Sequence, residues 1–322
     1  MSGLLSVRDL KVAYRTDEGD VVALRGVDLD VRRGEVLGVA GESGCGKSTL
    51  ASTVLRLHPA TARVSGSVLV DGADVLTMRW GDLRALRWAG ASIVFQGALH
   101  SLNSVRRIGT QIAEPIRLHE PEVGRAELDR RVGELLEQVG LPASRRTAYP
   151  HQLSGGQRQR VMIAMALACR PSLVIADEPT TALDVMVQAQ VLSLLSGLVR
   201  ELGVGMVLIS HDLAVLRQVC DRIAVMYAGR VVEEGPAQEV FGAALHPYAA
   251  ALSSAFPRIG DPASRYAPAG LAGDPPDLRL ALEGCSFAPR CPRAVDRCTA
   301  VDPPLEEHAP DRAAACIRVG EP

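Results

Sequence analysis

Two spacings of apolar residues alternate along most of the chain. Val27, Leu29 and Val31 alternate with acidic residues, which is the period-two pattern of a strand with one buried face. The segment "EVLGVA" at 35–40 is a short apolar run that ends at Gly41, as a buried strand ends at a turn. Apolar runs of the same kind predict further strands at 173–176, 205–210 and 222–227.

Apolar residues at helical spacing lie between these strands. One such face spans 128–139 and is followed by Gly140 and Pro142, which are typical residues after the end of a helix. A second face spans 191–202 and is followed by Gly203. Because strands alternate with helices, the pattern predicts an α/β domain with a largely parallel sheet.

The pattern changes after residue 245. Eleven of the 20 prolines lie between Pro257 and Pro322, and no long periodic segment remains there. Such a segment buries little apolar surface by itself and needs a cross-link, such as a metal site, to hold it together. We therefore predict two domains, at 1–245 and at 246–322.

Composition and charge argue against a nucleic-acid-binding protein and against a membrane-spanning one. Lys and Arg total 35 against 37 acidic residues, and the net charge of −2 argues against a nucleic-acid partner. The N-terminal segment lacks the pattern of a signal peptide, and no uncharged apolar run reaches the roughly 18 residues of a membrane-spanning helix. We therefore expect a cytoplasmic protein, in which clustered cysteines indicate a metal more than disulfides.

A phosphate-binding motif stands between a predicted strand and a predicted helix. The segment "GESGCGKST" at 41–49 fits the pattern G-x-x-x-x-G-K-[ST]. In this motif backbone N–H groups wrap the phosphates, Lys47 adds a positive charge, and Ser48 offers a hydroxyl to Mg²⁺. The candidate ATP-binding residues of this segment are Gly41, Ser43, Gly44, Cys45, Gly46, Lys47, Ser48 and Thr49.

Two acidic residues end the predicted strand of "LVIADEP" at 173–179. A magnesium site needs such an acid near the phosphate loop, so we expect Asp177 to hold Mg²⁺ and Glu178 to polarise the attacking water as a general base. A solvated acidic turn is the alternative, but the phosphate loop favours the magnesium site. His211 ends another predicted strand and is a candidate phosphate contact.

The segment "LSGGQRQRVMIAMALA" at 153–168 opens with paired glycines that lead into a helix. The string "LSGGQ" resembles the signature of ABC-type ATPases, and the other motifs follow in that family's order. By this resemblance the signature acts on ATP held by a second subunit. Its residues are Ser154, Gly155, Gly156 and Gln157.

The resemblance assigns further roles along the chain. Gln96 in "VFQ" is the Q-loop residue. It would take part in magnesium binding with Ser48 and Asp177. It would also take part in catalysis with Glu178 and His211. Asp184 in "ALD" belongs to the D-loop. Tyr14 in "LKVAY" would stack on adenine, although strand-edge packing is the alternative for this residue alone.

The resemblance covers residues 4 to about 245 and implies a fold class and partners. The fold class is α/β: a P-loop ABC-type ATPase domain with a mixed sheet, a RecA-like core and a helical subdomain, joined to a small Cys-containing, Pro-rich C-terminal extension. Two such ATPases, identical or paralogous, would form a head-to-tail dimer on the cytoplasmic face of the cell membrane. The other expected partners are two transmembrane permease subunits and, indirectly, an extracytoplasmic substrate-binding protein.

Other stretches resemble the ATPase subunits of dipeptide and oligopeptide importers. They are "EPTTALDVMVQAQVL" at 178–192, "HPYAAAL" at 246–252 and "GCSFAPRCP" at 284–292. The resemblance implies ATP hydrolysis that energises import of di- or oligopeptides, with nickel, glutathione or another small solute as the alternative cargo. An ABC protein of DNA repair would carry long insertions before the signature, and a metabolic kinase would not carry "LSGGQ".

Four cysteines lie in the extension, with the spacing C-x5-C-x6-C-x17-C. Four thiolates can close a metal site that fixes several loops at once. Zinc usually takes a shorter pair of cysteines, whereas an iron–sulfur cluster takes four and tolerates longer spacings, and the importer resemblance implies [4Fe–4S]. Zinc, free thiols without a metal, and competition from His308 remain alternatives. The candidate ligands are Cys285, Cys291, Cys298 and Cys316.

Overall fold

The computed structural model describes residues 3–95, 101–180, 183–255, 271, 273–280 and 282–321. By internal contacts the chain divides into two units, and the division predicted at residue 245 stays a prediction. The first unit comprises Met1–Ser6, Asp30–Val36 and Leu69–Ile209. The second comprises Val7–Leu29, Leu37–Val68 and Ser210–Pro322.

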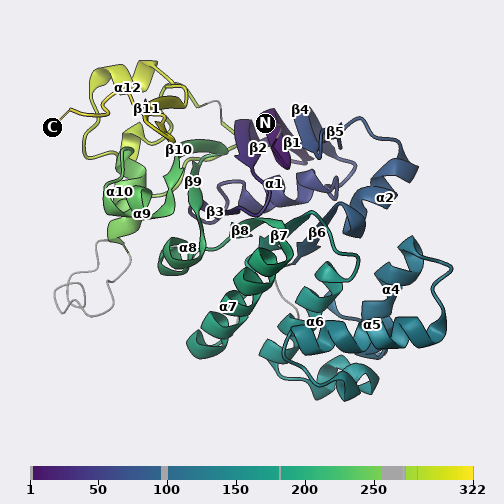
Figure 1. Ribbon diagram of the computed structural model, residues 1–322. Helices are drawn as coiled ribbons and strands as arrows, with labels where there is room; N and C mark the ends of the chain where they lie inside the picture. The colour runs from purple at the N-terminus through teal and green to yellow at the C-terminus, as the bar shows by residue number, and fades with distance from the viewer. Residues whose placement is uncertain are drawn as a thin grey trace. The chain divides into compact units, whose positions relative to one another are not determined.

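Three parallel strands form the sheet of the first unit. They are β6 (Ala91–Val94), β7 (Leu173–Asp177) and β8 (Gly205–Ile209), and β7 lies between the other two (Figure 1). Every residue of β7 and β8 is buried, which explains why these strands, apart from Asp177 at the end of β7, are continuous apolar runs instead of alternating. The register places Asp177 opposite Ile209, so both acidic candidates lie at the carboxyl end of the sheet.

Helices make up most of the rest of the first unit. Three of them, α4 (Ile108–His119), α5 (Arg125–Gln138) and α6 (Gly155–Leu167), pack against one another. The apolar face of α5, which includes Leu128, Val132 and Leu136, is buried as its helical spacing predicted. The remaining elements of this unit are β5 (Ala73–Asp74), α2 (Trp80–Ala89), η1 (Ala143–Thr147), η2 (Pro150–Gln152) and α7 (Val185–Leu202).

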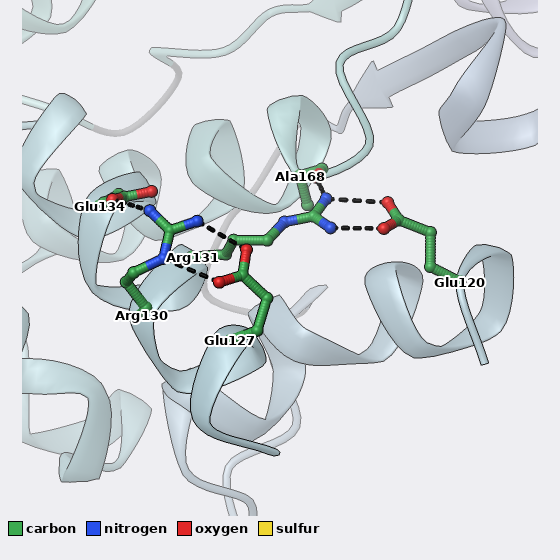
Figure 2. A network of polar contacts seen from close by, with 6 residues as sticks. All are labelled: Glu120, Glu127, Arg130, Arg131, Glu134 and Ala168. Atoms are coloured by element: carbon green, nitrogen blue, oxygen red, sulfur yellow. Dashed lines mark hydrogen bonds and ion pairs between the residues drawn. The ribbon is translucent and has the colours of Figure 1, made fainter. Parts of the chain in front are cut away.

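A set of ion pairs holds the ends of these helices (Figure 2). Arg131 of α5 forms two hydrogen bonds, of 2.6 and 2.9 Å, with the carboxylate of Glu120 just after α4, and a longer one of 3.5 Å with the carbonyl oxygen of Ala168 just after α6. Its neighbour Arg130 pairs with Glu127 and Glu134 of its own helix. Arg131 therefore joins three helices, whereas Arg130 stabilises one.

Among the helices that the structure describes, α7 alone is long and apolar enough to cross a membrane, judged by length and composition only. Its buried residues form a stripe that includes Val191, Leu195 and Leu198, and the helix packs against α6. That stripe is typical of a helix that covers one side of a protein core.

The second unit contains most of β1 (Leu5–Thr16), β2 (Gly19–Val31) and β4 (Ala62–Val70), in the order β2-β1-β4. It also contains a mixed sheet, in which β3 (Val36–Ala40) pairs in parallel with β9 (Arg222–Tyr227). An antiparallel series, β10 (Arg230–Pro236), β12 (Arg312–Ala314) and β11 (Glu306–Ala309), continues from β9. Its helices are α1 (Lys47–Val54), α8 (Leu213–Val219), α9 (Ala237–Gly242), α10 (Pro247–Ser254), η3 (Ala288–Arg290) and α12 (Asp296–Ala300).

The Pro-rich extension packs directly onto this unit. Strand β12 pairs with β10, with Ala314 opposite Glu233. An aromatic cluster, defined as Tyr227, Tyr248 and Phe287, joins β9 to two parts of the extension, α10 and the residue before η3, with ring centroids 4.6 to 5.3 Å apart. All three residues are at least 98% buried. The chain has only five Tyr and four Phe, so this cluster holds a third of them. Aromatic burial therefore supplies core that the extension lacks by itself.

Candidate functional site

The phosphate loop begins directly after β3 and leads into α1. Three of its glycines have a positive φ: 153° at Gly41, 79° at Gly44 and 105° at Gly46. At Gly46 an added Cβ would lie 2.5 Å from the carbonyl oxygen of Ala23, so this position requires glycine. The loop therefore runs close to neighbouring backbone and leads into the N-terminus of α1, an arrangement suited to phosphate.

The ammonium group of Lys47 lies inside this loop. Its Nζ donates hydrogen bonds of 2.8 Å to the carbonyl oxygens of Gly41 and Glu42, and only 7% of the residue is exposed. Neutral carbonyl partners fix the ammonium without cancelling its charge, so the charge stays available to an anion. Burial raises the pKa of the Cys45 thiol above its ordinary value, so Cys45 packs in the loop as an uncharged side chain at pH 7.

The remaining residues of the motif lie toward its open side. Ser43, Gly44 and Ser48 are exposed, and Thr49 is half-buried. The hydroxyl of Tyr14, on β1, lies 3.3 Å from the Thr49 hydroxyl and donates to it. The structure therefore brings Tyr14 to the phosphate loop, as the proposed adenine contact requires.

Asp177 and Glu178 belong to the first unit. Asp177 is the last residue of β7 and is 7% exposed. Glu178 follows it with a φ of +45°, and its N–H donates a hydrogen bond of 3.0 Å to the carbonyl oxygen of Ile209. A positive φ is unusual for a residue with a Cβ and costs energy, and such strain is common at functional sites. The backbone therefore fixes Glu178 at the carboxyl end of the sheet.

The predicted signature is the start of α6. Ser154 is the N-cap: its hydroxyl accepts a hydrogen bond from the Gln157 N–H at 3.3 Å, and the Gln157 side chain accepts one from the Ser154 N–H at 3.1 Å. Ser154 is exposed, whereas Gly156 is buried, and an added Cβ there would lie 2.4 Å from Val187. The glycine therefore allows α6 to approach α7 closely, while the hydroxyl faces outward.

Two further candidates lie at the starts of helices. Asp184 caps α7 by accepting a hydrogen bond of 3.0 Å from the Val187 N–H, and it is exposed. His211 is an exposed residue of the second unit and immediately precedes Asp212, the cap of α8. Gln96 lies outside the described residues, as does the alanine of "ALD".

All four cysteines of the extension line one small cavity, together with Phe287 and other residues. The backbone draws them together: the Cys285 N–H donates to the Cys298 carbonyl at 2.8 Å, and the Arg318 N–H donates to the Cys316 sulfur at 3.4 Å. Burial raises the pKa of both Cys285 and Cys291, and the charges of Cys298 and Cys316 raise it further. These thiolates therefore need a compensating positive charge if they are to form together.

The same cysteines are not arranged around a single ion. Within the described part of the chain, no group of three or more His, Cys, Asp or Glu side chains is placed to hold one metal ion. All seven cysteines are free thiols. The alternative ligand His308 is exposed on β11, its Nε2 lies 3.3 Å from the Ala314 carbonyl oxygen, and it does not belong to the residues that line the cavity.

Sequence reasoning missed two residues next to the phosphate loop. The carboxylate of Glu42 forms two hydrogen bonds, of 2.7 and 2.9 Å, with the guanidinium of Arg290 in the extension. Glu42 occupies a position that the phosphate-loop motif leaves free, and 248 positions separate it from Arg290. A charged residue at such a free position was the only signal that the sequence offered.

Comparisons with known families match both parts of the chain. Residues 24–181 match the family described as ABC transporter, and residues 232–298 match the family described as Oligopeptide/dipeptide transporter, C-terminal region. The first match includes the phosphate loop and the signature, and the second includes three of the four extension cysteines. The two families therefore follow the order in which the sequence motifs occur.

Solved structures agree with the fold. The chain is similar to a dimeric ATP-binding cassette in a post-hydrolysis state bound to ADP and Pi, with a TM-score of 0.65 and 30% identity over 72% of this chain and 98% of that one. It is also similar to cbiO1 of Clostridium perfringens, with a TM-score of 0.64 and 31% identity over 76% of this chain and 92% of that one. The predicted α/β fold of an ABC-type ATPase is confirmed.

Curated relatives extend the similarity to nearly the full chain. The oligopeptide transport ATP-binding protein OppD of Escherichia coli K12 is 44% identical over 98% of this chain and 93% of its own length. A probable peptide ABC transporter ATP-binding protein of Sinorhizobium fredii is 44% identical over 99% of this chain and 96% of its own length. The chain therefore belongs to the ATP-binding subunits of ABC transporters, in the dipeptide/oligopeptide importer group.

Proposed function

We propose that this ABC transporter ATPase energises the import of di- or oligopeptides at the cytoplasmic face of a membrane. The observation that carries the proposal is the phosphate loop with its buried Lys47 ammonium, in a chain that is similar to oligopeptide transport ATPases over 98% of its length. The peptide cargo is supported by the match of residues 232–298 to the C-terminal region of peptide transporters.

The phosphate loop binds the nucleotide in this proposal. The loop N–H groups and Lys47 bind the β- and γ-phosphates, Tyr14 packs against adenine, and Ser48 holds Mg²⁺ with Gln96 and Asp177. The distance of 3.3 Å between the hydroxyls of Tyr14 and Thr49 supports the position of Tyr14 at this loop. The ATP-binding set is Tyr14, Gly41, Ser43, Gly44, Cys45, Gly46, Lys47, Ser48 and Thr49.

Glu178 acts as the general base in the hydrolysis step. It accepts a proton from the water that attacks the γ-phosphorus, the bond to the bridging oxygen of ADP breaks, and inorganic phosphate forms. Lys47 stabilises the negative charge on the phosphate oxygens, and His211 and Gln96 contact the reacting γ-phosphate and water. The fixed backbone of Glu178, with its N–H bonded to Ile209, supports a carboxylate with one defined position.

The signature completes the site of a second ATPase, which is an identical or a paralogous subunit. Ser154 is exposed at the N-terminus of α6, where a hydroxyl and helix N–H groups suit a phosphate. Ser154, Gly155, Gly156 and Gln157 would thus bind ATP in the partner, and Asp184, exposed at the start of α7, would lie in the same interface. Two permease subunits and an extracytoplasmic binding protein complete the transporter, which has no nucleic-acid partner.

The four extension cysteines hold a [4Fe–4S] cluster in this proposal. A cubane cluster takes one cysteine per iron, so the four sulfurs surround it instead of meeting at one ion. The observation that supports this proposal is the single cavity that all four cysteines line. Zinc is the alternative, and it would require all four sulfurs to meet around one ion.

Metal analysis separates these two possibilities. Iron, sulfide and zinc would be measured on full-length protein purified without oxygen, together with its ultraviolet–visible spectrum. About four irons and four sulfides per chain support the cluster. One zinc per chain supports the zinc site, and a metal-free protein contradicts both.

Transport is the test of the cargo. The chain would be reconstituted in vesicles with its permease subunits, its partner ATPase and the binding protein, and uptake of a labelled tripeptide would be measured. We expect uptake that requires ATP and stops in the Glu178→Gln variant. Uptake of nickel or glutathione without uptake of peptides would contradict the proposed cargo.

A further inference from the structure

Glu42 is fixed in the phosphate loop by three separate contacts. Its carbonyl oxygen accepts a hydrogen bond of 2.8 Å from Lys47, and its N–H donates one of 2.9 Å to the Tyr248 hydroxyl. Its carboxylate accepts the two hydrogen bonds of Arg290. Two of the three partners lie beyond residue 245, so segments outside the predicted ATPase domain set the position of this loop residue.

The charge of Glu42 needs compensation at this place. A carboxylate in a loop that binds phosphates repels the anionic ligand and weakens its binding. Arg290 supplies the opposite charge in a bidentate pair whose arginine side chain is only 5% exposed, where solvent screens the interaction weakly. Arg290 also donates to the Tyr227 hydroxyl at 3.3 Å, which fixes the guanidinium further.

The segment that carries Arg290 also forms the wall of the cysteine cavity. Arg290 ends the single turn η3 and directly precedes Cys291. Phe287 directly precedes that turn, lines the cavity, and packs its ring against Tyr248 with centroids 5.3 Å apart. A change in the backbone between Cys285 and Cys291 therefore moves both the phenyl ring behind Tyr248 and the guanidinium that pairs with Glu42.

We propose that the C-terminal extension is part of the nucleotide site. Arg290 is a positioning residue: it cancels the charge of Glu42 and, with Tyr248, holds the backbone that orients Lys47. The binding of ATP therefore depends on the integrity of the four-cysteine module. This inference rests on the proposed ATP site and is independent of the proposed peptide cargo.

Nucleotide affinity of the full-length chain tests the role of Arg290. ADP binding would be measured by calorimetry on protein purified without oxygen, and ATP hydrolysis would give kcat and KM. We expect R290A to raise the Kd for ADP and the KM for ATP about tenfold, with a smaller fall in kcat, because Lys47 is less well oriented while the general base Glu178 is untouched. R290K should recover part of the affinity through its charge, although it cannot form the bidentate pair.

Two matched variants separate the charge effect from a loss of packing. R279A removes another arginine of the extension, which pairs on the surface with Asp277 and Glu18 instead of Glu42, and it should bind ADP like the wild type. The double variant R290A/E42Q should bind ADP more tightly than R290A, because it removes the uncompensated carboxylate. An R290A protein with the affinity of R279A, or a double variant as weak as R290A, overturns the inference.

The link to the cysteines has its own test. C291A should weaken ADP binding by a factor similar to R290A, and the combination of both should be no weaker than either alone, since both act through Glu42. Multiplied effects would place the action of Cys291 elsewhere and contradict the link. If the purified protein holds no metal and R290A still weakens ADP binding, only the proposed cluster is refuted. If the wild type binds ADP normally but the transporter takes up no peptide, only the proposed cargo is refuted.

Discussion

Single residues at the carboxyl end of the parallel sheet carry the strongest mechanistic expectations. Asp177 ends β7 inside the sheet, while the next residue, Glu178, has a positive φ and an N–H bonded to Ile209. The side chains of these adjacent acids therefore start from very different backbone geometries. This difference agrees with separate roles, one as a magnesium ligand and one as a base.

Replacement of Glu178 tests the second of these roles. Glu178→Gln keeps the shape of the side chain but cannot accept a proton from water, so we expect kcat to fall by roughly 100-fold to 10,000-fold. ATP binding should persist, and the variant should collect as a closed dimer in the presence of ATP. Phosphate release and gel filtration measure the two effects, and a normal turnover rate would show that Glu178 is not the base.

Lys47 gives the complementary expectation. Lys47→Ala removes the ammonium that the carbonyls of Gly41 and Glu42 hold within the loop. We expect ATP affinity and kcat to fall together, kcat by about 100-fold or more, because the charge acts on both bound and reacting phosphate. Calorimetry and phosphate release on the same preparation measure both, and a loss of affinity at unchanged kcat would limit Lys47 to binding.

At the scale of helices, Arg131 and Arg130 offer a controlled comparison (Figure 2). Arg131 is 17% exposed in its side chain and joins α5 to the ends of α4 and α6, whereas Arg130 is 57% exposed and pairs within α5. We expect Arg131→Ala to lower the free energy of unfolding by about 1 kcal/mol and Arg130→Ala to lower it much less. Urea titration of both variants measures the difference, and equal effects would show that the link between helices adds nothing.

The effect of Arg131 should also depend on pH. The hydrogen bond from Arg131 lowers the pKa of Glu120 below its ordinary value, so the unfolded chain takes up this proton at a higher pH than the folded chain does. The stabilisation is therefore complete above the unfolded pKa of 4.5 and is lost as the pH falls through the folded value. The gap in stability between wild type and Arg131→Ala should narrow on acidification below 4.5, and a constant gap would contradict this origin.

At the scale of the whole molecule, local patterns were enough for some features and insufficient for others. The buried strands β3, β7 and β8, the amphipathic helices and the phosphate loop follow from spacing and from glycine, which act over a few residues. The pair of Glu42 and Arg290 and the cluster of Tyr227, Tyr248 and Phe287 could not be predicted, because they join segments far apart in the chain. Long-range pairs leave no periodic signal, so only the folded chain reveals them.

Removal of the extension tests whether it is an independent domain. Strand β10 pairs with β12, and the fully buried Glu233 accepts a hydrogen bond of 3.2 Å from Arg312, whose side chain is 9% exposed. Burial raises the pKa of Glu233, and the hydrogen bonds from Leu245, His246 and Arg312 oppose that rise. Loss of one member of such a buried pair costs about 3 to 5 kcal/mol, a large part of the stability of a domain.

We therefore expect a chain truncated after residue 254, which keeps α10 and removes the rest of the extension, to aggregate or to unfold at a much lower temperature. The truncation removes Arg312 and also Phe287, which covers Tyr227 and Tyr248. Circular dichroism melts would compare it with the milder Phe287→Ala, for which we expect a loss of about 3 to 5 kcal/mol, and with Phe287→Leu, for which we expect less. A truncated chain that melts like the full one and binds ADP with the same affinity would show that the ATPase domain folds without its extension and that Arg290 plays no part in the nucleotide site.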